Sequence, residues 1–242
     1  MAQYDCYRGS NLVTGIYRGS TPVTQICKGG ELVYSKIKPN ARVFDTYSAG
    51  SGTFTPPVRG YYRIMLQAGG GGGGAAGDGP RDYKACEGGG GSGSYVDGIW
   101  WLEAQAYSYT IGDGGNGAGG LYTTVRGATG GDSTFGSLIT TYGGVGGYAR
   151  WTDGSGGAPA GGAGGATPYV DGNQYQLIYC GAGATGGAHS GAGTANGGNL
   201  HNWTTGGKGG DAYSAGYTAT GYKGNAGFLM IDYKGHDPRL FK

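Results

Sequence analysis

The side chains best suited to recognising another molecule lie in four segments that glycine blocks separate. These segments are rich in Tyr, Trp, Asn and Thr and poor in Lys and Glu. Aromatic rings give a large, rigid contact area at little entropic cost, while hydroxyl and amide groups hydrogen-bond to the partner, and the same mixture suits sugars. The segments are YARWTD (148–153), TPYVDGNQYQLIYC (167–180), NLHNWTT (199–205) and DAYSAGYTATGYK (211–223).

Six residues of these segments are the predicted contacts with a binding partner, through ring stacking and hydrogen bonding. They are Trp151, Tyr169, His201, Asn202, Trp203 and Tyr217. Each aromatic ring among them has an alternative role, because tyrosine can fill a core in a chain that is short of Leu and Ile. Trp100 and Trp101 are assigned to the core, since they adjoin the strand-like sequence LEAQAYSYTI.

Residues for catalysis or metal binding are sparse. Glu31, Glu87 and Glu103 lie far apart in the sequence, whereas glycoside hydrolysis needs two carboxylates at a defined separation. The three histidines have no metal-ligand spacing, and the four cysteines form no CxxC pair. We therefore expect no enzymatic activity, no metal and no cofactor, and reduced cysteines that pack as small apolar residues.

The composition combines an extreme glycine content with many aromatic residues. The 242 residues include 61 glycines, yet 12% of the chain is aromatic, whereas disordered segments contain few aromatic residues. Charged residues make up 13% of the chain, and its net charge of +2 does not indicate binding to nucleic acid or to an anionic membrane. No segment approaches the roughly 20 apolar residues of a spanning helix, and the first residues do not form a secretory signal. We expect an ordered protein that is made in a cytoplasm.

Three glycine segments share one spacing and predict how the bare backbone is used. GGVGGY (143–148), GGAGGA (161–166) and GGKGGD (206–211) all read GGxGGx. A polyproline II helix turns once in three residues, so this spacing puts glycine on two of its three faces and lets neighbours pack closely. Such helices have no internal hydrogen bonds, so neighbours must supply the partners. The pattern predicts a bundle of polyglycine II helices that presents the aromatic segments as tip loops; flexible glycine loops between strands are the alternative.

The first residues contain a ten-residue repeat. Its three units are CYRGSNLVTG (6–15), IYRGSTPVTQ (16–25) and ICKGGELVYS (26–35). Apolar and β-branched residues on both sides of a Gly-Ser or Gly-Gly step predict two short strands and a tight turn. A ten-residue unit cannot bury its own apolar face, so it needs the next repeat or other copies of the chain. A three-unit meander packed on the main body is the alternative.

Strand patterns dominate the rest of the chain, and helix signals are nearly absent. An alternating strand through Tyr62, Ile64 and Leu66 ends at a glycine run. A terminal strand puts Phe228 and Met230 on one face and Leu229, Ile231 and Tyr233 on the other. The predicted fold is all-β, with N-terminal hairpin repeats followed by a glycine-rich body of short strands, packed polyglycine II helices and tip loops.

The order of four motifs resembles the glycine-rich domain of bacteriophage tail fibre and receptor-binding proteins over about residues 50 to 233. The motifs are GTFTPPVRGYYRIMLQAGGGGGG, YSYTIGDGGNG, GGDSTFGSLITTYGGVGG and GNAGFLMIDY. The chain is also similar to the tip adhesins of T-even-like phages, in which polyglycine II helices form a bundle and the intervening segments bind the bacterial surface. The N-terminal units look like repeats near the start of phage tail proteins.

This resemblance implies a non-enzymatic tail fibre tip adhesin in the virion, made in the host cytoplasm, that binds a bacterial surface glycan or surface protein. The N-terminal repeats would attach it to other tail or fibre proteins. A homotrimer is expected, although some tip adhesins cap a fibre as monomers. The alternatives are a structural fibre or virion-decoration subunit without recognition, and an ice-binding protein, against which the tyrosine-rich loops argue.

The expected organisation has four parts. Residues 1–37 form an N-terminal β-repeat attachment module, and residues 38–48 form a linker. Residues 49–233 form the glycine-rich receptor-binding domain, and residues 234–242 form a C-terminal tail.

Overall fold

The computed structural model of the chain contains only β-strands as regular elements, among the residues that it describes. The described residues are 6–8, 11–13, 16–18, 20–23, 25–28, 31–35, 37–76, 84–119, 124–152, 160–190, 193–195, 197–198, 212–214 and 219–237. All the strand pairs found there are antiparallel. The expectation of an all-β fold is therefore confirmed.

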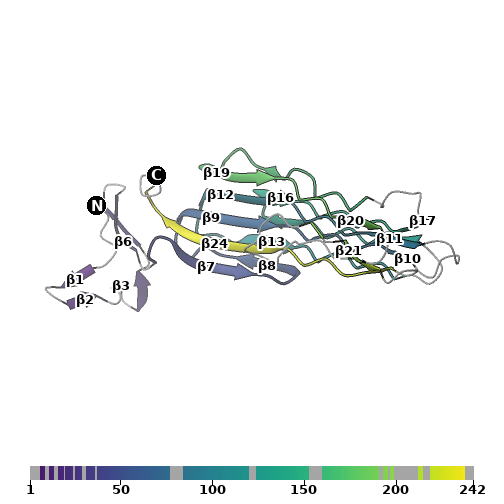
Figure 1. The fold of residues 1–242 in the computed structure, drawn as a ribbon. Coiled ribbons are helices and arrows are strands. Elements are labelled where there is room, and N and C mark those ends of the chain that lie inside the picture. The colour runs from purple at the N-terminus through teal and green to yellow at the C-terminus, as the bar shows by residue number, and fades with distance from the viewer. Residues whose placement is uncertain are drawn as a thin grey trace.

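Two five-stranded sheets pack against each other, and we call them together the sandwich. The first has the order β19 (Gln176–Gly181), β12 (Tyr95–Leu102), β9 (Gly60–Gln67), β24 (Phe228–Gly235) and β7 (Ala41–Thr46). The second has the order β18 (Tyr169–Val170), β16 (Ile139–Thr141), β15 (Ser133–Phe135), β13 (Tyr107–Ile111) and β8 (Gly50–Phe54). Both sheets lie in the middle part of the molecule (Figure 1), and both contribute side chains to its main hydrophobic core.

The core of the sandwich follows from the alternation of side chains along its strands. Tyr62, Ile64 and Leu66 of β9 are fully buried against Phe135 and Ile139 of the other sheet. Burying one large apolar side chain stabilises a fold by about 1.5 to 3 kcal/mol. The alternation of the terminal strand is also as expected, since its odd-numbered residues join this main core. The residues concerned are Leu229, Ile231 and Tyr233.

The outer face of the first sheet holds a second, smaller cluster. Phe228 and Met230 pack there with Met65 and Tyr95.

The assignment of the paired tryptophans to the core holds for one of them. Trp100 is buried in the main core. Trp101 is only partly buried, and its ring contacts those of Tyr61 and His236, at centroid distances of 5.0 and 4.7 Å.

The expected linker, residues 38–48, contains strand β7 and so is part of the sandwich. β7 pairs with β24, and its Arg42 forms an ion pair with Asp232 of that strand. Phe44 packs its ring against Phe54 and Tyr109 of the second sheet, at centroid distances of 5.5 and 5.3 Å. The polar composition of this stretch predicted a linker, because the residues on the exposed side of the strand are polar.

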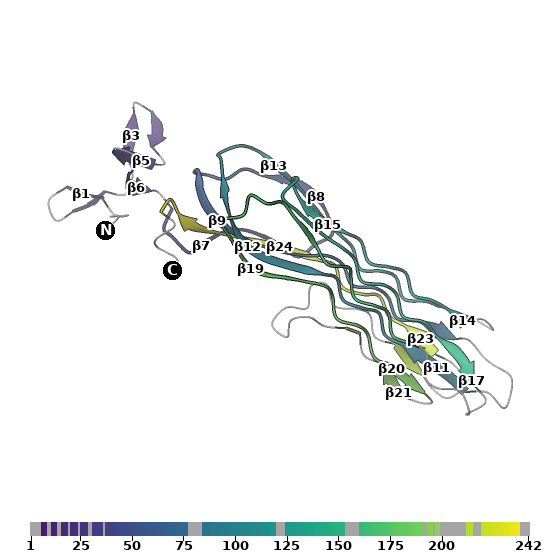
Figure 2. The same cartoon turned by 90° about the horizontal axis from the view of Figure 1, so that it is seen from above.

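Irregular segments rich in glycine run side by side from the sandwich toward the far end of the molecule, and we call them the glycine body (Figure 2). Their described residues are 68–74, 89–94, 112–119, 126–132, 142–149, 160–168, 182–187, 197–198 and 222–227. Most of their glycines lie against the backbone of a neighbouring segment. A Cβ on Gly71, for example, would lie 2.3 Å from the carbonyl oxygen of Val145.

Backbone hydrogen bonds in the glycine body repeat every third residue. The N–H groups of residues 69 to 74 donate in turn to three neighbouring segments, and every third donor returns to the same one. The bonds are Gly69 to Gly131 and Gly72 to Ala128, Gly70 to Asn225 and Gly73 to Tyr222, and Gly71 to Gly91 and Gly74 to Gly88, all at 2.8 to 3.0 Å. Hydrogen bonds between segments, not within them, therefore satisfy this backbone.

Three short strand pairs precede the sandwich, and each forms a two-stranded sheet among the described strands. They are β1 (Cys6–Arg8) with β2 (Asn11–Val13), β3 (Ile16–Arg18) with β4 (Thr21–Val23), and β5 (Gln25–Lys28) with β6 (Glu31–Ser35). The figures draw these pairs beyond the end of the sandwich at which the C-terminus also lies (Figures 1 and 2). The far end of the glycine body is thus distant from both chain ends.

Candidate functional site

Two small sheets form the far end of the molecule, which we call the tip (Figures 1 and 2). One has the order β14 (Thr124–Val125), β10 (Ala75–Ala76), β23 (Ala219–Gly221), β22 (Ala212–Ser214) and β21 (Gly193–Ala195). The other has the order β17 (Arg150–Thr152), β11 (Lys84–Gly88) and β20 (Ala188–Ser190). Strands form here where the glycine runs end and successive residues with a Cβ follow.

The central strand of the smaller tip sheet carries its polar chemistry. In β11, Cys86 lies opposite Arg150 on one side and opposite Ser190 on the other. Glu87 lies opposite His189, and both Cys86 and Glu87 are fully buried. Because successive side chains of a strand point to opposite faces of its sheet, Cys86 shares one face with Arg150, and Glu87 is buried on the other.

Three segments that join or follow these strands contain polar residues and two tyrosines, Tyr83 and Tyr217. Residues 77–83 join β10 to β11, residues 153–159 follow β17, and residues 215–218 join β22 to β23. They lie outside the described residues.

No group of three or more His, Cys, Asp or Glu residues that could hold a metal ion occurs within the described part of the chain. The same part of the chain contains no helix with the length and apolar character needed to cross a membrane. These two findings concern the described residues alone.

The chain matches the family model described as glycine-rich domain over residues 46–237. It belongs to the glycine-rich domain family. The match takes in the glycine body, the tip strands and the sandwich apart from most of β7, and it leaves out the three N-terminal strand pairs. No curated protein sequence matches the chain.

Within this glycine-rich domain, the structure separates the predicted contact residues. Trp151 lies in β17 of the tip, opposite Ala85. Tyr169 lies in β18 of the sandwich, where it is 55% exposed. The expectation that residues 167–180 form a tip loop is wrong, because they contain β18 and β19. The other predicted contacts lie outside the described residues: His201, Asn202, Trp203 and Tyr217.

Charged pairs of the glycine-rich domain lie on the sandwich and the glycine body. Arg63 donates to both carboxylate oxygens of Asp97, at 2.8 and 2.5 Å, and Asp97 is buried. The hydrogen bond to Asp97 raises the pKa of the Arg63 guanidinium. On the glycine body, Lys223 donates to Asp113 at 2.6 Å, and this bond lowers the pKa of the Asp113 carboxyl. Both pairs join segments of the scaffold that are far apart in the sequence.

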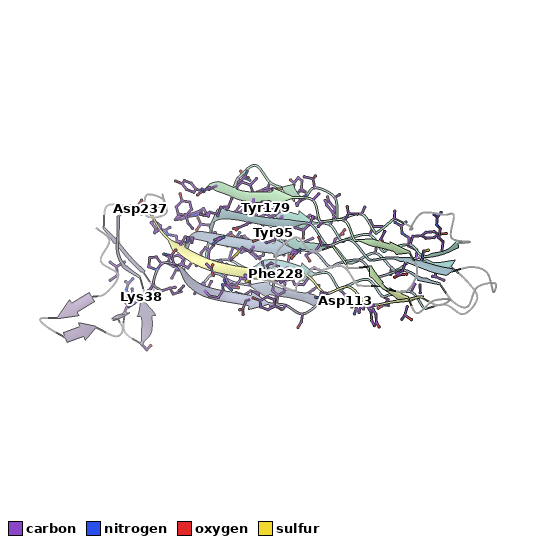
Figure 3. All side chains as sticks on the ribbon, in the orientation of Figure 1. Lys38, Tyr95, Asp113, Tyr179, Phe228 and Asp237 are labelled. Atoms are coloured by element: carbon purple, nitrogen blue, oxygen red, sulfur yellow. The ribbon has the colours of Figure 1, made fainter. Side chains whose placement is uncertain are left out.

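Aromatic side chains also cross the outer face of the first sheet, which sequence reasoning missed. The ring of Tyr95 lies 5.7 Å from that of Tyr179 and 5.9 Å from that of Phe228 (Figure 3). Tyr47 continues the row, 5.9 Å from Phe228, and its hydroxyl donates to the sulfur of Met230 at 3.0 Å. In β12, Tyr95 and Val96 point to opposite faces of the sheet because side chains alternate along a strand. This alternation was the sequence signal that could have placed Tyr95 on the outer face.

Sequence reasoning also missed the polar residues of the smaller tip sheet. Sequence reasoning weighed Glu87 as a catalytic carboxylate. It found no metal-ligand spacing for His189 and assigned it as a hydrogen-bonding surface residue. Both stand in short stretches between glycine runs, KACEG and AHS. The available signal was the interruption of the glycine runs by these short polar stretches.

Proposed function

We propose that this glycine-rich domain protein is a bacteriophage tail fibre tip adhesin, which binds a bacterial surface glycan or surface protein through its tip. One observation carries the proposal. The tip and both chain ends lie at opposite ends of an elongated body, so that one end is available for attachment while the other is presented (Figures 1 and 2). Loops on a rigid scaffold are the usual site of binding residues.

Of the predicted contacts, Trp151 is the one whose described backbone lies at the tip, in β17. A tryptophan ring stacks on the apolar face of a pyranose or fills a pocket of a protein surface, and it loses little rotamer entropy. We assign it, with the residues of segments 77–83, 153–159 and 215–218, to the receptor-contacting surface. Many such tips on one virion would raise a weak single-site affinity through multivalency.

The glycine segments act in this proposal as packed polyglycine II helices that keep the tip rigid. The support is the period of three in their hydrogen bonds, which equals the repeat of that helix. The segments GGVGGY (143–148) and GGAGGA (161–166) belong to the glycine body, whereas GGKGGD (206–211) lies outside the described residues. Crystallographic backbone angles near those of polyproline II test this part, and irregular coil in both described segments would contradict it.

The N-terminal strand pairs serve in this proposal as the attachment module to other tail or fibre proteins. Isolated two-stranded sheets are marginal in water, so these pairs are suited to joining a partner. A homotrimer whose three tips point the same way is the assembly that we propose for the virion.

The test is adsorption of the fluorescently labelled full chain to a panel of bacterial strains. The proposal predicts adsorption to particular strains that excess unlabelled chain displaces. Folded chain that adsorbs to none of a panel including the phage's host would overturn the proposal and favour a structural fibre or virion-decoration subunit.

A further inference from the structure

Strand β19 is an edge of the sandwich that lacks the usual protection. It pairs with β12, and no other described strand pairs with it. Leu177 and Ile178 are 41% and 47% exposed, and Tyr179 is 39% exposed. Residues 172–188 contain no charged side chain. An exposed apolar edge strand is a template for pairing with another strand.

The other three edges of the sandwich are each protected. β7 carries the exposed charged residues Arg42 and Asp45, and charges on an edge oppose pairing. β18 has only two residues, and β8 contains two glycines in its sequence GSGTF. β19 has six residues, and its one irregularity is a register shift on the side that faces β12, between Asp97 and Gly98. The contrast singles out β19 as the edge of the sandwich that is open to a further strand.

The chain itself supplies strands that need a neighbour. Each N-terminal strand pair is a two-stranded sheet on its own among the described strands, and such sheets gain stability from a third strand. The pair β5–β6 is the longest, with four and five residues, and it stands closest in sequence to the sandwich. Strand β6 of this pair, with five residues, is close in length to β19, which has six.

This pair cannot reach β19 of its own chain. The backbone N–H of Asn40 donates to the carbonyl of Tyr233 at 2.6 Å, which fixes the chain at the β7 edge of the sheet. From Ser35 to Asn40 the chain spans at most about 18 Å. A strand placed outside β19 would lie five strand spacings from β7, about 24 Å. The β5–β6 pair and the β19 edge therefore face different copies.

We propose that the β5–β6 pair of one copy adds to strand β19 of a neighbouring copy, and that this contact joins the copies of the chain. The contact is head to tail, because it joins different surfaces of the two copies. Head-to-tail contacts close into rings when the rotation between copies allows it, and a ring of three keeps all tips pointing one way. The proposal rests on the assembly part of the proposed function and adds the surface that receives the neighbour.

Two variants of the full chain test the contact through the mass in solution, by light scattering. Ile178→Lys puts a charge on the receiving edge, and Val33→Pro removes a backbone donor from β6. The wild-type chain should be oligomeric, and each variant should fall to the mass of one chain, 24.4 kDa. Asp45→Lys on the protected β7 edge is the control and should keep the wild-type mass. Circular dichroism verifies that each variant is folded.

Mixing the two variants distinguishes this contact from other modes of association. Ile178→Lys retains an intact β5–β6 pair, and Val33→Pro retains an intact β19, so the mixture should form one-to-one pairs of twice the single-chain mass. Self-pairing of β19 would instead make Val33→Pro dimerise alone, and that result would overturn the proposal. So would a monomeric wild-type chain or an unchanged mass for Ile178→Lys. These measurements do not depend on adsorption to bacteria. They therefore still test the contact between copies if the receptor-binding proposal fails.

Discussion

The backbone N–H of Gly144 donates a hydrogen bond to the carbonyl oxygen of Gly69 at 2.9 Å, although the two residues lie far apart in the sequence. Three residues further along, Gly147 donates to Gly72 at 2.8 Å. A Cβ on Gly144 would lie 2.0 Å from the carbonyl oxygen of Gly91. Position 144 therefore requires glycine, because the backbones of the segments that contain Gly69 and Gly91 both lie close to it.

Replacing Gly144 with alanine should therefore destabilise the domain by about 1 to 3 kcal/mol, because the neighbouring backbone must move to admit the methyl group. Gly119 is the matched control, since a Cβ there would meet nothing within 4 Å. Gly119→Ala should change the free energy of unfolding by no more than about 0.5 kcal/mol. Denaturant unfolding of the two variants checks this, and equal effects would contradict the role given to close packing.

The buried carboxylate of Asp97 gives a second prediction. Asp97→Ala leaves Arg63 without its bidentate partner, and the cost should be about 2 to 3 kcal/mol, less than for a fully buried pair because the Arg63 side chain is 33% exposed. Lys223→Ala breaks an exposed pair with Asp113 and should cost less than about 1 kcal/mol. Thermal or denaturant unfolding at neutral pH measures both, and a larger loss for Lys223→Ala would contradict the account.

Stability should fall in alkaline solution because of Tyr62. Burial raises the pKa of its phenol, whose hydroxyl donates to the carbonyl of Val58 at 2.6 Å. The unfolded chain loses this proton near pH 10. The folded chain keeps it to higher pH, so this stability is complete below about pH 10 and declines as the pH rises toward the folded pKa.

Unfolding free energies measured at pH 8 and above pH 10 check this prediction. Tyr62→Phe is the control, because it removes the titrating group while keeping the ring. The variant should be less stable at pH 8, since it loses the hydrogen bond to Val58, but its stability should decline less with rising pH. An identical decline in both proteins would assign the effect to other groups.

The position of two aromatic residues predicts different effects on adsorption. Trp151 lies in the tip strand β17, whereas Tyr169 lies in the sandwich strand β18. Trp151→Ala should weaken adsorption to a bound strain about tenfold or more, the loss expected for one stacked aromatic ring worth at least about 1.4 kcal/mol. Tyr169→Ala should leave adsorption unchanged. Binding isotherms on cells check this, and a loss confined to Tyr169→Ala would move the receptor surface to the sandwich.

The strands of the sandwich core could be read from the sequence because their apolar residues alternate. The faces assigned to Phe228 and Leu229, and the buried alternation from Tyr62 to Leu66, are found in the structure. β7 escaped detection because its charged residues Arg42 and Asp45 made it look like a linker. An edge strand with one exposed side has little apolar signal to offer.

The arrangement of the candidate site was harder to predict. Short strands such as β10, with two residues, owe their position to the glycine segments that deliver them and not to their own pattern. Tyr169 and Trp151 have similar local sequence, with polar and glycine residues nearby. Which of them reaches the tip depends on how many glycine segments precede each turn, and local composition does not contain that information.

The most direct test of receptor binding through the tip is hydrogen exchange of the full chain, alone and with envelope fragments of a strain that it adsorbs to. The account predicts slower exchange in peptides that cover residues 77–83, 153–159 and 215–218, with exchange in β9 and β12 of the sandwich unchanged. Slower exchange confined to the sandwich, or no change anywhere while the fragments are bound, would contradict it.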